Sequence, residues 1–424
     1  MKEDFLHFLW KYKLFNTLEL ETTEGEPLSV VKPGTHNLHS GPDFSNAQIK
    51  IGDKLWNGNV EIHIKSSDWY QHAHQNDDAY KNVVLHVVYE DNKEVFLTQK
   101  GDLPVLELKS IIAPNYLEKY ELLQQSRGWV PCANQFPKVD QFKVDQYLER
   151  LVLNRLQRKS TEVLRIYFEC KKDWNEAFYR WLARSYGFKI NSDSFEELAK
   201  RVPLKLLKKH SNSLAQVEAL LFGQAGMLDP EFKDEYCLNL QKEYKFLAKK
   251  YDLRPMKVVS WRFSKTHPSN FPTKRIAQLA AFLCHEQGTF SKVLTLDSVQ
   301  EMMNLLSTET SVYWKDHYRL DVHTNQKRTG AMGKSSVESL IINSICTVLY
   351  TYGRKAEDFS MVDRALDFLE KLKPERNSII NSWKSIGLEV FSAKSTQALI
   401  ELKRENCELK KCLTCLFGLE ILKA

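Results

Sequence analysis

The stretch that decides the fold is GPDFSNAQIKIGDKLWNGNVEIHIK, residues 41–65. Two strand-like runs, 43–52 and 54–65, lie between the Gly, Pro and Asn residues that punctuate this part of the chain. Successive side chains of a strand point to opposite faces, so Glu61, His63 and Lys65 share one face and the apolar residues between them share the other. The pattern predicts two adjacent strands of a hairpin with polar groups gathered on one face. Any half-exposed strand has the same pattern.

Helix-like and strand-like segments surround this hairpin. Residues 3–13 carry apolar side chains at helical spacing, and residues 82–90 (NVVLHVVYE) form an almost continuous apolar run, as a buried central strand does. The polar segment 66–80 between them predicts a solvent-facing helix. The order of helix, strands, helix and strand predicts an α/β domain with a mixed sheet over residues 1–110.

The pattern changes to amphipathic helices from residue 141 onward, where apolar residues recur at i, i+3, i+4 and i+7. Residues 111–140 have few periodic positions and predict a linker or hinge. We therefore expect an α+β protein in which the α/β head (1–110) is followed by a large all-α body (141–424) that ends in a cluster of cysteines.

Composition narrows the class of protein. The chain has 43% hydrophobic and 27% charged residues, which is typical of a folded protein, and no apolar run of the length that a membrane span needs. The N-terminal residues do not resemble a signal peptide, and eight scattered cysteines fit a reducing compartment. These features predict a cytoplasmic protein without a membrane partner.

Charge is distributed unevenly along the chain. Residues 1–110 hold 11 Lys/Arg against 17 Asp/Glu, whereas the remainder has a net charge of +12. A metal-binding head with a body that binds a polyanion would have this distribution, and so would unevenly solvated surfaces.

Asp43 and Glu61 are the candidate metal ligands. Asp43 begins one predicted strand and Glu61 lies in the next, so the two carboxylates could lie side by side in the hairpin. Adjacent carboxylates repel each other unless a cation lies between them, and Mg²⁺ or Mn²⁺ prefers such oxygen ligands. His63 or Lys65 could then orient a metal-bound water or neutralise charge on a phosphate.

The order of these elements resembles the core of the PD-(D/E)XK nuclease superfamily over roughly residues 3–90. Pro42-Asp43 matches the first motif and Glu61 the second acid, while His63 stands where that superfamily has Lys. Lys65, on the same face, could take over the role of that Lys. The resemblance implies a metal-dependent nuclease that acts on nucleic acid. The alternatives are a nucleic-acid-binding protein with a decayed site and a helical protein-interaction scaffold.

A second resemblance extends along the whole chain. The stretches GPDFSNAQIKIG, GNVEIHIKSSDWYQHAHQNDDAYKNVVLHVV, ALLFGQAGML, NFPTKRIAQLA and CELKKCLTC are similar to a bacterial family of uncharacterised proteins, domain-of-unknown-function family 2851. This resemblance implies no established activity.

Histidines are concentrated in the first 90 residues, which hold seven of the twelve. His72 and His74 could complete a metal site, and zinc is then the rival metal because imidazole suits it better than Mg²⁺. Two residues spaced in this way lie on different sides of a helix, so an exposed position without a functional role is an equal alternative. His86 lies in an apolar strand and is expected to be a buried, hydrogen-bonded histidine.

Three cysteines near the C-terminus, Cys407, Cys412 and Cys415, have the spacing C-x4-C-x2-C. Thiols this close in a reducing compartment suggest a metal, and Cys132, in a non-periodic segment, is the best candidate for a fourth ligand. Some PD-(D/E)XK nucleases hold an iron–sulfur cluster with one distant cysteine and a C-terminal trio. That analogy implies [4Fe–4S]; tetrahedral Zn²⁺ and simple core packing remain alternatives.

Basic and aromatic residues alternate in WRFSKTHPSNFPTKRIAQLA, residues 261–280. Such a mixture near a helix N-terminus can hold phosphates and stack on bases, which makes Arg262, Lys265, Lys274 and Arg275 candidates for nucleic-acid contact. Pro272 is also an ordinary first residue of a helix, so a purely structural role is the alternative.

Overall fold

A computed structural model of the chain describes residues 1–97, 101–264, 266–285, 289–324 and 329–424. These residues form two compact units. Met1–Asp145 and Leu402–Ala424 make the first unit, and Gln146–Glu401 make the second. The division differs from the predicted domains, because the C-terminal segment with its cysteines belongs to the same compact unit as the N-terminal part of the chain.

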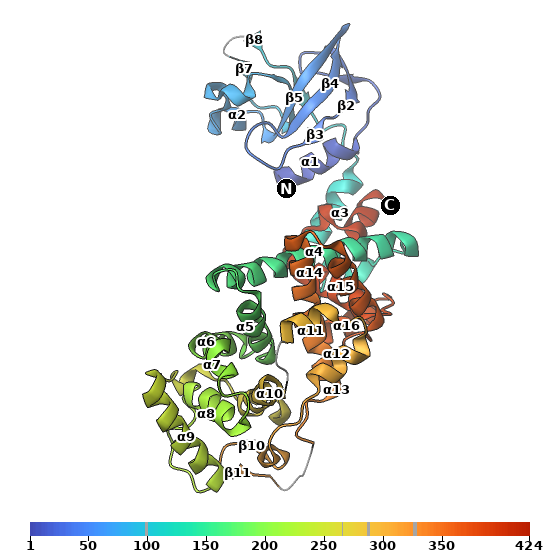
Figure 1. Ribbon diagram of the computed structural model, residues 1–424. Coiled ribbons are helices and arrows are strands. Elements are labelled where there is room, and N and C mark those ends of the chain that lie inside the picture. The colour runs from blue at the N-terminus through green and yellow to red at the C-terminus, as the bar shows by residue number, and fades with distance from the viewer. Residues whose placement is uncertain (98–100, 265, 286–288, 325–328) are drawn as a thin grey trace. The chain divides into compact units, whose positions relative to one another are not determined.

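A mixed sheet forms the centre of the first unit (Figure 1). Its strand order is β1-β2-β4-β5-β6-β9, and β3 pairs with β4. The strands are β1 (Leu20–Glu21), β2 (Pro27–Lys32), β3 (Thr35–His36), β4 (Phe44–Ile51), β5 (Lys54–Lys65), β6 (Val83–Glu90) and β9 (Val105–Glu107). All neighbours from β1 to β5 are antiparallel, whereas β5, β6 and β9 run parallel to one another. The predicted hairpin and the predicted mixed sheet are confirmed.

The β4–β5 hairpin is closed by Gly52-Asp53, where Ile51 pairs with Lys54. Gly52 has a φ of 56°, a left-handed conformation that glycine adopts without a steric penalty. Beyond β5 the chain crosses over to β6, a central strand whose first six residues, Val83 to Val88, are all buried. This continuous burial explains the apolar run in the sequence, since parallel strands are covered on both faces.

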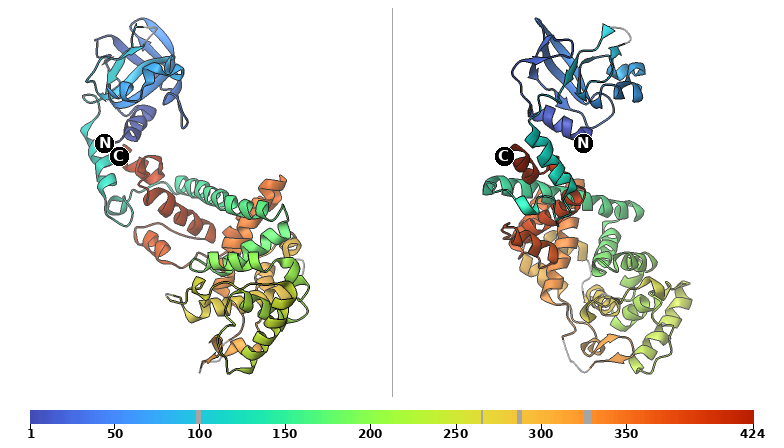
Figure 2. Two further views of the ribbon diagram at one scale, coloured as in Figure 1. Left: turned by 90° about the vertical axis from the view of Figure 1, so that its left-hand side faces the viewer. Right: turned by 180° about the vertical axis from the view of Figure 1, so that it is seen from behind.

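Short helices cover this sheet (Figure 2). α1 (Glu3–Tyr12) buries five apolar side chains, and it packs against β5 as α2 (Asp68–Gln71) does. The rest of the expected helix over 66–80 is not one helix. It is broken into the 3-10 turns η1 (His74–Asn76) and η2 (Asp78–Tyr80), because Ala73 takes a left-handed φ of 59° between α2 and η1. β7 (Phe96–Leu97) and β8 (Gly101–Asp102) form a separate ribbon.

The remainder of the first unit comes from two distant parts of the chain. α3 (Pro114–Gln125), η3 (Ala133–Gln135) and the first residues of α4 (Gln141–Glu169) lie in the middle of the sequence, and the π-segment η8 (Leu402–Cys407), η9 (Cys412–Thr414) and α18 (Leu416–Lys423) end it. The Phe136 and Phe417 rings lie 4.7 Å apart, and the Gln124 side chain donates a hydrogen bond to the Lys410 carbonyl at 3.1 Å.

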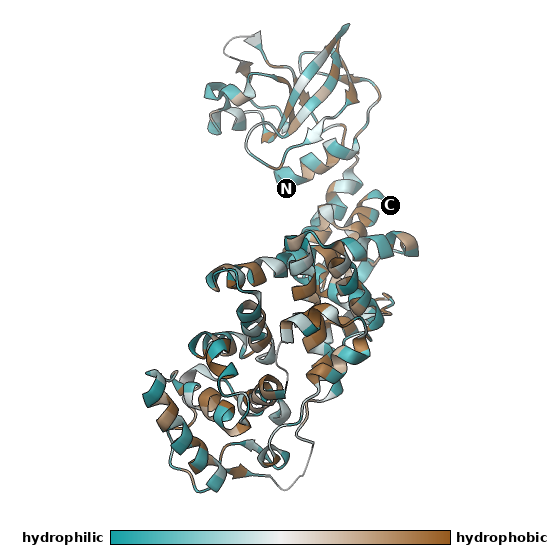
Figure 3. Ribbon diagram, in the orientation of Figure 1, coloured by the Kyte–Doolittle hydropathy of each residue, from teal (hydrophilic) through white to brown (hydrophobic). Residues whose placement is uncertain are grey.

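The second unit is almost entirely helical, as the amphipathic pattern predicted. Its helices after α4 are α5 (Trp174–Tyr186), α6 (Ser192–Arg201), α7 (Leu204–Lys208), α8 (Leu214–Gln224), α9 (Glu235–Tyr251), α10 (Pro272–His285), α11 (Thr289–Thr295), α12 (Val299–Leu306), α13 (Lys334–Leu340), α14 (Cys346–Ala356), α15 (Phe359–Lys371), α16 (Ser378–Ser385) and α17 (Ala393–Glu401). A small ribbon of β10 (His317–Arg319) and β11 (Val322–His323) accompanies them. Hydrophobic and hydrophilic residues alternate along the same ribbons in Figure 3.

Helix length and hydropathy also bear on the membrane question. Among the residues that the structure describes, no helix is both long enough and apolar enough to cross a bilayer.

Candidate metal centre

The structure brings Asp43 and Glu61 together through the pairing of β4 with β5. The backbone N–H of Asp43 donates to Glu61 Oε2 at 3.1 Å, and the backbone N–H of Ile62 donates to Asp43 Oδ2 at 3.0 Å. Each carboxylate is therefore held by the backbone of the opposite strand. On the other side of Asp43, its Oδ2 lies 3.2 Å from Nε2 of His7 on α1.

Glu61 presents its second oxygen to histidines. Oε1 lies 3.6 Å from Nε2 of His63 and 3.2 Å from Nε2 of His74, and the Glu61 side chain is only 6% exposed. Burial, together with the nearby negative charge of Asp43, raises the pKa of Glu61. A cation placed against Oε1 would compensate both effects.

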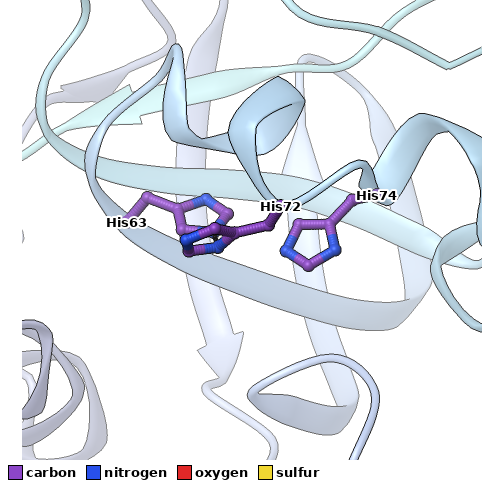
Figure 4. Close-up of side chains that lie close together, drawn as sticks. All are labelled: His63, His72 and His74. Carbon is purple, nitrogen blue, oxygen red and sulfur yellow. Dashed lines mark hydrogen bonds between the residues drawn. The ribbon is translucent and has the colours of Figure 1, made fainter.

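His72 and His74 reach this place because the segment after β5 is not one helix. α2 ends at Gln71, the left-handed Ala73 reverses the chain, and η1 starts at His74. The two side chains therefore approach His63 from above β5, where a continuous helix would have separated them. Figure 4 shows the three imidazoles of His63, His72 and His74 turned toward one another.

The spacing of these three rings suits a single metal ion. One nitrogen from each of His63, His72 and His74 lies within 4.8 Å of the others, and His63 Nε2 lies 3.1 Å from His72 Nδ1. A tetrahedral ion bonded to nitrogens at about 2.0–2.1 Å holds them roughly 3.3–3.4 Å apart. His74 Nε2 is buried, and Glu61 Oε1 lies 3.2 Å from it. The three imidazole nitrogens, with Glu61 Oε1 beside those of His63 and His74, are donors that fit Zn²⁺ or Mn²⁺ better than Mg²⁺, which prefers oxygen.

His86, on β6, orients His63 from behind. His63 Nδ1 and His86 Nε2 are 2.8 Å apart, and this hydrogen bond leaves Nε2 of His63 directed at the centre. His86 is fully buried and hydrogen-bonded, as the sequence predicted. Burial, with the neighbouring imidazoles, lowers the pKa of His63 to about 2 and that of His86 to about 3. Both rings are therefore neutral at pH 7, the form in which imidazole binds a metal.

The roles predicted for the strand residues are distributed differently in the structure. His63 lies in the centre of the cluster, whereas Lys65 is exposed at the end of β5. Among the described residues, no ion pair joins the Lys65 ammonium to Asp43 or Glu61. The sequence predicted Asp43 and Glu61 as the metal ligands and left the roles of His72 and His74 open. In the structure His63, His72 and His74 form the group close enough to share one ion, and Glu61 lies beside two of them.

Two of the four candidate nucleic-acid residues of the second unit are in its interior. Lys274 and Arg275 at the start of α10 are 4% and 3% exposed. The Lys274 ammonium donates to the carbonyl of Trp314, and Arg275 donates to side chains of its own unit. Arg262 is exposed, and Lys265 lies outside the described residues. The Lys274 and Arg275 side chains thus hold α10 in place.

The four predicted cysteine ligands, by contrast, meet. Cys132, Cys407, Cys412 and Cys415 are all buried in the first unit, where they line one cavity. The amphipathic pattern of the helical body predicts that Cys170, Cys237, Cys284 and Cys346 are core residues. Cys170, Cys237 and Cys346 are buried in the second unit, whereas Cys284 is only partly buried.

Fold and site together define an α+β protein with a histidine-rich candidate metal centre on its N-terminal sheet. The chain belongs to the family described as Protein of unknown function (DUF2851), whose model matches residues 3–378. The match includes the whole candidate centre and ends before Cys407. No curated protein and no solved structure matches the chain.

Proposed function

We propose that the first unit is a metal-dependent nuclease whose metal is held by His63, His72, His74 and Glu61. The observation that supports this proposal is that three imidazole nitrogens lie within 4.8 Å of one another, with the buried Glu61 Oε1 at 3.6 Å from His63 Nε2 and 3.2 Å from His74 Nε2. A bound ion would lower the pKa of a coordinated water and so supply a hydroxide nucleophile.

The protein residues around that point have separable roles. Glu61 is fixed because its Oε2 accepts from the Asp43 backbone, so its Oε1 stays directed at the histidines. His63 is fixed by His86 in the same manner. Asp43 and His7 form a second pair at 3.2 Å, in which the hydrogen bond and charge of Asp43 outweigh burial and raise the pKa of His7. This pair would donate a proton to a leaving oxygen.

Two features favour a phosphodiester substrate. The order α1, antiparallel β2-β4-β5, α2 and parallel β6 is similar to the PD-(D/E)XK core, with Asp43 and Glu61 at the two acidic positions of that motif. The net charge of +12 over residues 111–424 would attract a polyanion. His72 is exposed, so the centre is open to a large substrate on that side.

A cleavage assay with the full chain tests the proposal. Single- and double-stranded DNA and RNA are incubated with chelator-treated protein and Mn²⁺, Mg²⁺ or Zn²⁺, or with EDTA. Glu61→Gln removes the charge of the carboxylate, and His72→Ala removes an exposed ring. His39→Ala is the matched control because His39 is an exposed histidine of the same unit outside the cluster.

We expect cleavage with Mn²⁺ that EDTA, Glu61→Gln and His72→Ala each reduce at least 100-fold, and that His39→Ala leaves unchanged. Cleavage that survives both site variants would refute the assignment of the centre. Protein that binds the metal but cleaves none of the four substrates would refute the nuclease reaction and leave the metal centre standing.

A further inference from the structure

Four cysteines from two distant parts of the chain meet in the first unit. Cys132 lies in the loop between α3 and η3, while Cys407 ends η8, Cys412 begins η9 and Cys415 precedes α18. They are between 6% and 9% exposed and line the same cavity. All four are free thiols, so no disulfide accounts for their convergence.

The backbone around the cavity is shaped for close approach. Gly418, on the first turn of α18, also lines it, and a Cβ at this position would meet the Cys412 carbonyl at 2.1 Å. Only glycine therefore lets α18 pack against the turn that carries Cys412. η8, which ends at Cys407, is a π-segment, a conformation that is uncommon in helices and frequent at functional sites.

The thiols influence one another and have cations beside them. Lys403 lies close enough to Cys407, and Lys410 close enough to Cys412, for each ammonium to favour a negative charge on that sulfur. Ordinary buried cysteines pack against apolar side chains as neutral thiols. Four of them gathered together beside lysines would instead suit an anionic centre, because a bound metal deprotonates its thiols outright and the lysines offset the charge.

The spacing separates a cluster from a single ion. Thiolates around one Zn²⁺, each at about 2.3 Å from it, lie roughly 3.8 Å apart. Among the described residues, the group close enough to share one ion is His63, His72 and His74, and the cysteines do not meet that condition. In an iron–sulfur cluster the cysteines bind different irons and lie farther apart.

We propose that Cys132, Cys407, Cys412 and Cys415 bind an iron–sulfur cluster that fastens the last residues of the chain to the loop after α3. The site is separate from the histidine centre and does not depend on its activity. The Phe136–Phe417 and Gln124–Lys410 contacts already join these two parts of the chain, and a cluster bound to residue 132 and to residues 407–415 would add its binding free energy to the stability of this part of the first unit.

The test is chemical analysis of the full chain prepared without oxygen, before and after reconstitution with ferrous iron and sulfide. We expect about two to four irons and an equal number of acid-labile sulfides per chain, with visible sulfur-to-iron charge-transfer absorption. Labile sulfide is specific, since a metal on the histidine centre brings none.

Cysteine variants test which thiols bind the cluster. Cys132→Ser and Cys412→Ser should each lose the labile sulfide and the visible absorption. Cys170→Ser is the matched control, because Cys170 is a buried free cysteine in the second unit, and it should retain both. Reconstituted wild type without sulfide would overturn the proposal, as would one zinc per chain that Cys132→Ser removes. Full iron and sulfide in Cys132→Ser would also overturn it.

Discussion

Removal of the His72 imidazole should weaken metal binding by at least about 100-fold. His72 supplies one of the four donor groups, and its Nδ1 lies 3.1 Å from His63 Nε2. Changing residues that merely support a metal ligand costs 10–100-fold in affinity, so the loss of a direct ligand should reach the upper end, or about 2.8 kcal/mol. His72 is exposed, so His72→Ala should change the stability of the metal-free fold by no more than about 0.5 kcal/mol.

Titration calorimetry with Zn²⁺ and Mn²⁺ on chelator-treated full chain measures the affinity directly. A second readout is protection of β5 and β6 amides from hydrogen exchange. Metal at 100 times the wild-type Kd should raise the free energy of unfolding of the wild type by about 2.7 kcal/mol. The same concentration should raise that of a variant with 100-fold weaker binding by only about 0.4 kcal/mol. His39→Ala should behave as wild type. An affinity for both metals that changes less than threefold in His72→Ala would refute the placement of the metal.

Three further predictions concern the second unit. Burial raises the pKa of Glu218 from 4.5 to about 7, so the folded state keeps a proton that the unfolded state loses as the pH rises. The free energy of unfolding, measured with urea, should therefore fall by about 3 kcal/mol from pH 4.5 to 7. Glu218→Gln should lack this dependence of stability on pH. Gly223→Ala places a Cβ 2.1 Å from a tyrosine ring on α9 and should cost about 1–3 kcal/mol in the same assay, while Gly333→Ala, which has open space, should cost nothing. Glu401→Ala removes the carboxylate that lies 3.2 Å from the buried Arg155 guanidinium and should cost about 3–5 kcal/mol. A loss below about 1 kcal/mol would contradict the pairing.

The sheet was predictable because its strands have strong local signals. Alternation in 54–65 placed Glu61 and His63 on one face, and the structure has both in the same cluster. Burial along this strand could not be read from the alternation. Residues 60 to 63 are all buried, because α1 and α2 both pack against β5. Lys65 is exposed since the strand ends there.

Only part of the histidine centre could be predicted from the sequence. Its strand residue, His63, was a candidate, but the participation of His72 and His74 depends on one left-handed residue, Ala73. Alanine carries no local signal for that conformation, since the tight turns that use it favour Gly or Asn. A histidine-rich segment next to a candidate strand was the available clue, and composition cannot say which way the rings point.

The basic segment at the start of α10 illustrates a different limit. Every residue from Pro272 to Leu283 is buried, so the helix is covered on all sides by its own unit. Charged side chains in a helical pattern normally predict a solvated face. Here, Lys274 satisfies a backbone carbonyl and Arg275 stacks on the Phe188 ring at 4.5 Å, contacts that only the folded chain brings together.

The polar groups between β5 and the α2 segment make a poor core for a sheet without a cation. The buried Glu61 has imidazoles beside its Oε1, and His86 Nδ1 has no hydrogen-bond partner among the described residues. Each such group costs about 1–3 kcal/mol, whereas the neighbouring positions of β6 show that valine fits this sheet. A metal ion would satisfy Glu61 Oε1 and His74 Nε2 at once and leave His86 as the support of a ligand. The same groups that weaken the metal-free fold are thus those that the proposed ion would use, so stability and metal binding should rise together.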